Sequence, residues 1–273
     1  DLSHYKSWLQ KVIKVFGAEN IDFIGPWNED WAGATDYAKL DLGIPIVGLE
    51  AWSLSSAPDQ YKKVHEHIHV AGSHNYVHGG VQPNLLDAYE QWEKFRSVAA
   101  MPAWFTETTL YAKSTAEGIA HMLPAISAGV ERMIIYQAVP RLIQVDGSDA
   151  EHFAATKRLI DYSFGMGPAR LVSTNSREAI LAAFVDGDKL HIHMCNVGNA
   201  GISTSIALQD GHTVARVSAE SFGNSGAQAE VLNGGMRIEV QLPSKTYVHL
   251  SCFGLDSSEA VICAPSVEEQ QRH

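Results

Sequence analysis

An alternation of strand-like and helix-like segments, from the start of the chain to Gly167, constrains the fold more than any other feature. Apolar runs rich in β-branched and aromatic residues predict strands at residues 21–27, 44–50, 68–71, 103–107 and 132–137. Helical spacing of apolar residues, or helix-start residues, predicts helices at 5–16 (with Ser3 as its cap), 35–42, 56–66, 84–99, 114–128 and 150–164. Strands that alternate with helices form a parallel sheet, so the expected fold class is α/β.

The pattern changes in the last third of the chain. Between about Arg170 and Phe253, short strand-like runs and turn residues follow one another, without a convincing helix. Asp186-Gly187-Asp188 lies between two apolar runs and signals a hairpin. Apolar and polar residues alternate over residues 237–242, as in a strand with one buried face. This region is therefore predicted to be an antiparallel β-sandwich.

The number of predicted parallel strands is smaller than a closed barrel needs. Five strands are predicted, whereas a (β/α)8 barrel has eight. Three explanations stay open: about three β/α units lie outside this chain, a second chain supplies them, or the sheet is not a barrel. We expect residues 1–167 to form the C-terminal part of a (β/α)8 TIM-type barrel, residues 168–255 the sandwich, and residues 256–273 a flexible tail.

Composition and charge narrow the range of partners. The chain has 273 residues, of which 45% are hydrophobic and 19% charged, as in a globular protein. Its net charge of −11 argues against a nucleic-acid partner, which would favour a basic surface. Cys195, Cys252 and Cys263 form no CxxC motif, so neither a zinc ribbon nor a dense disulfide framework is expected. No apolar run reaches the roughly 18 residues of a membrane span, and none is predicted.

Two glutamates follow predicted strands and are the strongest candidates for chemistry. Glu29 comes after the run at 21–27, and Glu107 ends the run at 103–107. In a parallel α/β barrel the carboxyl ends of the strands carry the reactive groups. Two carboxyl groups meeting there suit the hydrolysis of a glycosidic bond, in which one protonates the leaving oxygen and the other attacks the sugar carbon.

The segments that contain these glutamates, Trp27-Asn28-Glu29 and Trp104-Phe105-Thr106-Glu107, resemble the clan A retaining glycoside hydrolases. The separation of the two glutamates, 107 − 29 = 78 residues, suits three β/α steps. Residues 5–29 more particularly resemble the galactocerebrosidase family, and the glucosylceramidase-like family shares the layout of barrel plus sandwich. Asp30 and Thr106 depart from the commonest residues of these families.

This resemblance implies a function and a role for each glutamate. Glu29 would be the acid/base at the end of strand 4, and Glu107 the nucleophile at the end of strand 7. The reaction would be hydrolysis of a β-glycosidic bond with retention, without a cofactor. The substrate would be a carbohydrate, namely a β-galactoside, a glycolipid or a polysaccharide, and the location secreted, lysosomal or periplasmic.

Other side chains at or near the strand ends are expected to bind the sugar. Asn28 would hydrogen-bond the sugar 2-hydroxyl, and aromatic rings would stack on sugar faces. The predicted substrate-binding residues are Asn28, Trp27, Trp52, His74, Tyr76, Trp104, Tyr136 and Gln137, with Glu50 as a reserve carboxylate. The alternatives are structural: tryptophans packed in the core, a satisfied core histidine, and acidic residues that only begin helices.

A competing motif, His65-Glu66-His67-Ile68-His69, matches the HExxH signature of zinc hydrolases. In that signature two histidines one helical turn apart bind zinc, with His74 or His78 as a conceivable third ligand here. However, the motif spans a predicted helix end and strand start. Extended backbone would separate His65 from His69 by roughly 13 Å, too far for one ion. We therefore expect no metal site there.

A third interpretation is a carbohydrate-binding or scaffold protein with an incomplete site. Residues from the first three strands of a barrel add sugar contacts in the related families, and no such strands are predicted in this chain. Activity of the isolated chain on an aryl β-glycoside distinguishes an enzyme from such a protein.

Overall fold

A computed structural model describes residues 1–29, 33–76, 85–109, 114–136, 138–169, 172–176, 178–224 and 226–256. Contacts within the chain define two compact units. The first unit comprises Asp1–Thr108 and Val130–Ile134, and the second comprises Thr109–Gly129 and Ile135–His273. Of the predicted tail at residues 256–273, Asp256 is described, and its N–H donates to the Thr213 carbonyl, whereas residues 257–273 lie outside the described residues.

The helices of the first unit follow the helical spacing of the sequence. They are α1 (Leu2–Phe16), η1 (Ala18–Asn20), α2 (Ala34–Ala38), α3 (Ala57–Val64) and α4 (Leu85–Val98). The expected cap of α1 was wrong: Asp1, not Ser3, is the N-cap, and its side chain accepts a hydrogen bond from the Ser3 backbone N–H. A carboxylate at this position also interacts favourably with the positive end of the helix dipole.

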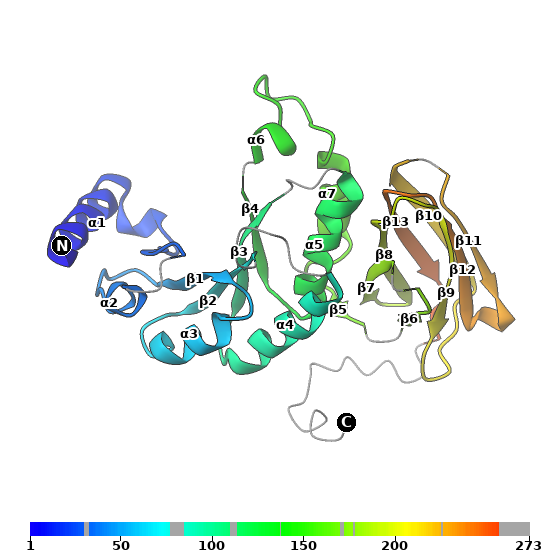
Figure 1. Cartoon of the computed structure of the whole chain (residues 1–273), viewed down its shortest axis with the longest axis horizontal. Coiled ribbons are helices and arrows are strands. Elements are labelled where there is room, and N and C mark those ends of the chain that lie inside the picture. Colours follow the sequence, from blue (N-terminus) through cyan, green and yellow to red (C-terminus); the bar gives the residue numbers. More distant parts are fainter. Residues whose placement is uncertain are drawn as a thin grey trace. The chain divides into compact units, whose positions relative to one another are not determined.

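The first sheet has four strands, β1 (Val47–Ser53), β2 (Val70–Tyr76), β3 (Ala103–Thr109) and β4 (Arg132–Tyr136), which follow one another in chain order (Figure 1). β1 pairs with β2, and β2 with β3, in parallel. The expected strand at residues 21–27 was wrong in extent, since only Ile24 forms a single parallel bridge, to Ile46. Pro26 explains part of this, because it has no N–H to donate to a ladder.

Helices cover one face of this sheet. α3 packs against β1, and the Trp92 ring of α4 lies 5.0 Å from the Phe105 ring of β3. Both rings are fully buried. The described residues thus form a four-stranded sheet, parallel at least from β1 to β3, with helices packed on one face.

The second unit contains the remaining helices, α5 (Thr115–Ser127), α6 (Ala138–Arg141) and α7 (Phe153–Asp161). The predicted helices at 114–128 and 150–164 are confirmed with shorter bounds, whereas α6 was not predicted. Ser114 caps α5, its hydroxyl oxygen accepting a hydrogen bond from the backbone N–H of Glu117. Within the described part of the chain, no helix is both long and apolar enough to cross a membrane.

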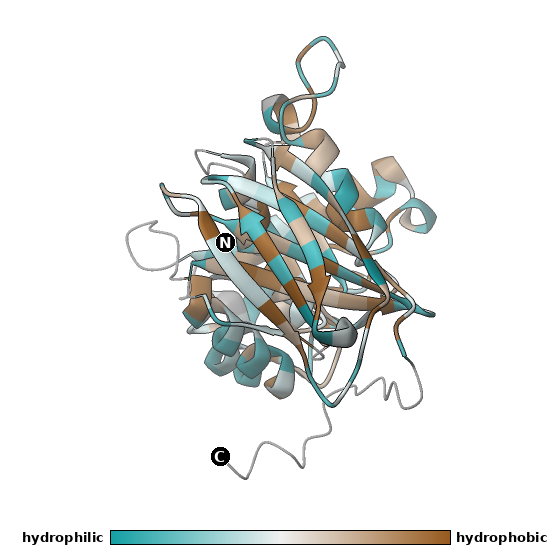
Figure 2. Ribbon diagram, turned by 90° about the vertical axis from the view of Figure 1, so that its right-hand side faces the viewer, coloured by the Kyte–Doolittle hydropathy of each residue, from teal (hydrophilic) through white to brown (hydrophobic). Residues whose placement is uncertain are grey.

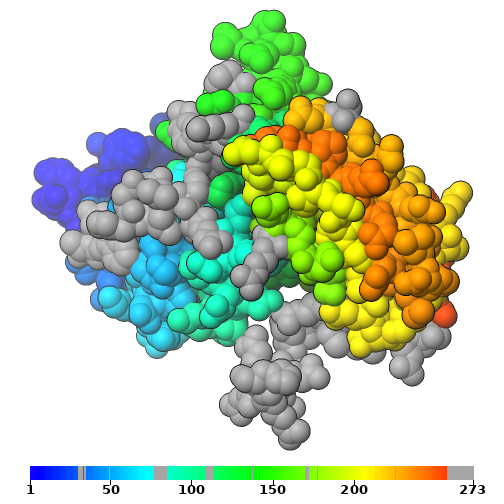
Figure 3. All heavy atoms as spheres, turned by 45° about the vertical axis from the view of Figure 1, so that its right-hand side comes forward, coloured from blue at the N-terminus to red at the C-terminus, as the bar shows by residue number. Residues whose placement is uncertain are grey.

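Two antiparallel sheets make up most of the second unit (Figure 1). Their residues are among the yellow-green to orange atoms of Figure 3. One has the order β10-β13-β8-β7-β5 and the other β11-β12-β9-β6. Gly187 and Asp188 form the predicted hairpin turn, since Asp186 pairs with Lys189. The strands are β5 (Gly167–Pro168), β6 (Val172–Thr174), β7 (Ala179–Asp186), β8 (Lys189–Asn196), β9 (Ile202–Leu208), β10 (Arg216–Gly223), β11 (Gln228–Leu232), β12 (Arg237–Leu242) and β13 (Thr246–Phe253).

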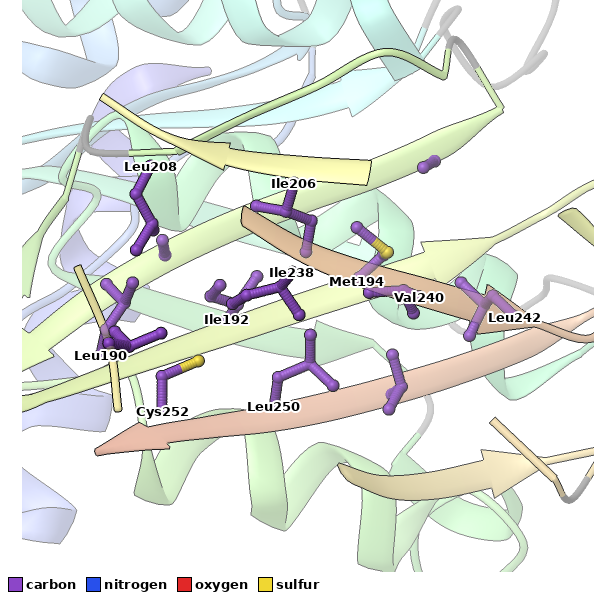
Figure 4. Packing of buried hydrophobic residues seen from close by; sticks show 14 of the residues in the cluster. Leu190, Ile192, Met194, Ile206, Leu208, Ile238, Val240, Leu242, Leu250 and Cys252 are labelled. Atoms are coloured by element: carbon purple, nitrogen blue, oxygen red, sulfur yellow. The ribbon is translucent and has the colours of Figure 1, made fainter. Parts of the chain in front are cut away.

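One hydrophobic core joins these two sheets, as expected for a sandwich. Hydrophilic and hydrophobic residues alternate along strands such as β12 and β9 (Figure 2), so these strands direct one face inward. The core takes side chains from both sheets (Figure 4), among them Leu190, Ile192, Met194, Leu250, Ile206, Ile238, Val240 and Leu242. Cys195 and Cys252 are buried free thiols.

Candidate active site

An irregularity in the pairing of β2 with β3 determines where Glu107 points. Trp104 belongs to a hydrophobic cluster that includes Val47 and Val70, whereas the next residue, Phe105, packs against α4 on the other face. Strict alternation would place Glu107 on the face of Phe105. However, Ser73 pairs with Phe105 and the following pair is His74 with Glu107, so β3 carries an extra residue. Such a bulge redirects side chains and is frequent beside active sites.

Glu107 is held by the strand beside it. The hydroxyl of Tyr76 donates a 2.8 Å hydrogen bond to Oε1 of Glu107. Tyr76 ends β2 and is 9% exposed, and Glu107 is half-buried. A hydroxyl bound to a carboxylate makes one of the stronger types of hydrogen bond, so the orientation of this carboxyl group is fixed.

Glu29 reaches the same place from the segment that follows Ile24. Its backbone is left-handed, with φ of 62°, and its N–H donates to the carbonyl oxygen of Glu50 at 3.3 Å. Left-handed backbone is uncommon for a residue other than glycine and concentrates at functional sites. The Glu29 side chain is 32% exposed, and its Oε1 lies 2.7 Å from Nδ1 of His74.

His74 is fully buried and lies among carboxylates. Burial alone would lower the pKa of His74, but the carboxylates of Glu50, Glu29 and Glu107 outweigh it and the pKa is raised. Nε2 of His74 lies 3.9 Å from Oε2 of Glu50, too far for a hydrogen bond in this arrangement, yet Glu50 is the largest of the influences that raise the pKa of His74.

The carboxyl groups of Glu29 and Glu107 therefore lie close together. One oxygen of each and one ring nitrogen of His74 are all within 4.8 Å of one another. Among the described residues, this is the one group whose spacing could also suit a metal ion. Two of its members already share a 2.7 Å hydrogen bond, and Tyr76 occupies an oxygen of the third. The arrangement is thus two hydrogen-bonded pairs, His74 with Glu29 and Tyr76 with Glu107, whose carboxyl groups approach each other closely.

Of the other predicted residues on these segments, two adjoin Glu29 in the chain and one packs in the core. Trp27 and Asn28 precede Glu29 directly; Asn28 is exposed, and the Trp27 ring lies 4.1 Å from that of Tyr37. Trp104 is only 8% exposed, in the hydrophobic cluster of the sheet. Its packing favours the structural alternative over stacking on a sugar.

The last three predicted binding residues are Trp52, Tyr136 and Gln137. Trp52 is half-buried on β1, and Tyr136 is 44% exposed at the end of β4. Tyr136 belongs to the second unit, whereas Glu29, His74 and Glu107 belong to the first. Gln137 lies outside the described residues.

The HExxH segment lacks the helical geometry that the zinc signature requires. α3 ends at Val64, so the motif lies in a turn rather than a helix. Nδ1 of His65 donates to the carbonyl of Lys62 at 3.1 Å, and Nδ1 of His69 accepts from the Ile46 N–H at 3.1 Å. No ligand group with metal spacing occurs there among the described residues.

Sequence reasoning missed the role of Gly25. A Cβ atom on Gly25 would come within 2.1 Å of Oε1 of Glu50, so the absent side chain leaves the room that this carboxylate occupies. The available signal was a glycine inside a strand-like run, which often marks a close approach of other atoms to the backbone.

The fold is similar to those of solved glycoside hydrolases. A GH30 endoxylanase from Clostridium papyrosolvens superposes with a TM-score of 0.65 at 16% identity, over 92% of this chain and 70% of that one. A bifunctional glucanase-xylanase from a metagenome library gives 0.57 at 13% identity, over 91% and 68%. A GH51 arabinofuranosidase from Xanthomonas axonopodis pv. citri gives 0.56 at 12% identity, over 84% and 66%.

These similarities concern the fold, because the identities are low. No protein-family model and no curated protein sequence matches the chain. The chain spans about two thirds of the length of the structures named above. Resemblance to glycoside hydrolases is thus supported by the fold, while assignment to the galactocerebrosidase family stays a prediction.

Proposed function

We propose that this chain carries the catalytic carboxylates of a retaining β-glycoside hydrolase, with Glu107 as nucleophile and Glu29 as acid/base. The observation that carries the proposal is the approach of their oxygen atoms to within 4.8 Å. Retaining enzymes hold the two carboxyl groups about 5–5.5 Å apart, whereas inverting enzymes need about 6.5–9.5 Å to admit a water molecule. The distance therefore favours a covalent glycosyl-enzyme intermediate.

Glu107 suits the nucleophile because its carboxylate is oriented before substrate binds. The hydrogen bond from Tyr76 to Oε1 stabilises the negative charge and leaves Oε2 to attack the anomeric carbon. In the first step, an Oε2–carbon bond forms as the glycosidic bond breaks. In the second step, the oxygen of a water molecule replaces Oε2 on the same carbon.

Glu29 suits the acid/base because its oxygen is joined to a titratable partner. It donates a proton to the leaving oxygen in the first step and accepts one from water in the second. Oε1 of Glu29 lies 2.7 Å from Nδ1 of His74, a fully buried histidine on β2, so the two groups can exchange a proton. Asn28 and Trp27, which adjoin Glu29 in the chain, are the proposed contacts to the sugar, together with Trp52.

A second candidate function, carbohydrate binding without turnover, is favoured by the open edge of the first sheet. β4 ends the strand order, and Ile134 within it is 50% exposed. Unpaired edge strands are normally covered. We propose that further β/α units, on another segment or chain, complete the barrel and contribute sugar contacts. If they are essential, the isolated chain will bind sugar without cleaving it.

Hydrolysis of aryl β-glycosides by the purified chain tests the function. We expect a product whose anomeric proton, recorded before mutarotation, shows the β configuration. Glu107→Gln should abolish turnover without changing the circular dichroism spectrum. Glu66→Gln, at an exposed position outside the site, is the matched control. Full activity in both Glu107→Gln and Glu29→Ala would overturn the assignment.

A further inference from the structure

The site contains a third carboxylate that the reaction above does not use. Glu50 lies on β1, where pairing passes from Gly48–Ala71 to Ala51–Ser73, so that β1 bulges between them. Its φ of 45° is left-handed, and its side chain is 19% exposed. A bulge and an uncommon backbone conformation together turn this side chain toward His74.

A backbone hydrogen bond and the absence of a side chain at Gly25 together define the position of Glu50. Its main-chain carbonyl accepts the Glu29 N–H, so the two glutamates are tied through the backbone. Its carboxylate lies over Gly25, where any side chain would collide with it. Glu50 therefore contacts Glu29 through the backbone, while its side chain faces the ring of His74, which in turn contacts the Glu29 side chain.

His74 lies between two carboxylates, one at each ring nitrogen. Nδ1 is 2.7 Å from Glu29, whereas Nε2, which is buried and has no hydrogen-bond partner, is 3.9 Å from Glu50. In a neutral imidazole, one nitrogen carries the proton and the other accepts. A carboxylate facing one nitrogen favours the tautomer with the proton on that side.

We propose that Glu50 is a positioning residue that keeps a proton on Nε2 of His74, so that Nδ1 is the atom that exchanges a proton with Glu29. The proposal rests on the proposed function, because it assigns the source of the acid/base proton. When both ring nitrogens carry protons, Nδ1–H donates to the Glu29 carboxylate. Transfer of that proton leaves neutral His74 with Nε2–H and a neutral carboxyl on Glu29, which is the acid that the first step requires.

The charges that face His74 from every side are consistent with this role. Glu29 approaches from the segment after Ile24, Glu50 from β1 and Glu107 from β3, while Tyr76 lies on the same strand, with its ring 5.8 Å away. The carboxylates raise the pKa of His74 despite its burial. Of these carboxylates, Glu50 is the one that faces Nε2.

Glu50→Gln tests the proposal because it removes the charge and nearly keeps the shape. We expect the midpoint of the His74 titration, followed by the side-chain nitrogen shifts in NMR, to fall by about one pH unit or more. The alkaline limb of kcat/KM should move down with it, and kcat should fall about tenfold or more with little change in KM. Glu66→Gln should leave all three unchanged.

Gly25→Ala provides an independent test, because its new methyl group should displace the Glu50 carboxylate. We expect the same shifts as for Glu50→Gln. In a Glu50→Ala background the added methyl group meets no carboxylate, so Gly25→Ala should there cause no further shift. Such non-additivity identifies residues that act through one another.

The outcomes separate this inference from the proposed function. Wild-type titration of His74 in both Glu50→Gln and Gly25→Ala would overturn the role of Glu50, even if Glu107→Gln is inactive. An active Glu107→Gln variant would instead contradict the hydrolase assignment. The NMR titration needs no turnover, so it tests the tautomer and the charge of His74 even if the isolated chain is inactive.

Discussion

The hydroxyl of Tyr76 donates a 2.8 Å hydrogen bond to Oε1 of Glu107, and the two residues lie on neighbouring hydrogen-bonded strands. The sheet itself therefore fixes the geometry of the proposed nucleophile. A site built on strands is held more precisely than one on loops, and the bulge at Thr106 is what directs Glu107 toward Tyr76.

Tyr76→Phe removes only the hydroxyl group and should lower kcat by about tenfold to a hundredfold, since a hydrogen bond to a charged group contributes about 1.5–3 kcal/mol. Steady-state kinetics on an aryl β-glycoside measures the effect. Tyr61→Phe is the matched control. Tyr61 lies on α3, is buried like Tyr76, and its hydroxyl accepts a hydrogen bond from the Ala100 N–H away from the site. Equal losses of kcat in the two variants would argue against a specific role for Tyr76.

The HExxH segment should not hold a metal. Its turn conformation and the hydrogen bonds of His65 and His69 oppose the geometry of a zinc site. We expect less than stoichiometric zinc in purified protein and unchanged activity after chelation. One zinc per chain, together with loss of activity on chelation, would favour a zinc hydrolase instead.

Regular periodicity was predictable from the sequence, whereas departures from it were not. The helical spacing of Trp8, Leu9 and Ile13 predicts α1, and alternation predicts β12. Glu50 and Glu107 reach the site only through bulges, which depend on pairing between strands and leave no mark in one strand's own sequence. The expected strand at 21–27 likewise depended on pairing, and only Ile24 pairs, in a single bridge to Ile46.

The core of the sandwich should be sensitive to loss of volume. Ile238 is fully buried between the two sheets. Ile238→Ala should lower the free energy of unfolding by about 2–5 kcal/mol, because it removes buried surface and leaves a cavity. Urea denaturation measures this change. Val145→Ala, at a position that is 90% exposed, should stay within about 0.5 kcal/mol of the wild type.

The second unit should lose stability in mild acid. Burial and nearby positive groups lower the pKa of His193 to about 4 and that of His249 to about 2. Nε2–H of His193 donates to the Tyr162 carbonyl, and Nδ1 accepts from the Tyr247 hydroxyl, so the folded state holds this ring neutral.

A histidine in the unfolded chain takes up a proton as the pH falls below 6.5, whereas in the folded chain His193 stays neutral down to about pH 4 and His249 down to about pH 2. The stabilisation is therefore complete above pH 6.5 and decreases as the pH falls toward about 4, by up to about 1.4 kcal/mol per pH unit for each histidine. Urea denaturation at pH 7 and pH 5 checks this. A His193→Gln variant should show a shallower dependence on pH, and an identical slope would contradict the explanation.

Azide rescue tests the central claim most directly, because the product identifies the role of each glutamate. With a 2,4-dinitrophenyl β-glycoside, Glu107→Gly plus azide should yield the α-glycosyl azide, since azide replaces the missing nucleophile. Glu29→Ala plus azide should yield the β-glycosyl azide, since azide then attacks the glycosyl-enzyme. If Glu107→Gly instead hydrolyses the substrate at the wild-type rate, or gives the β-azide, Glu107 is not the nucleophile.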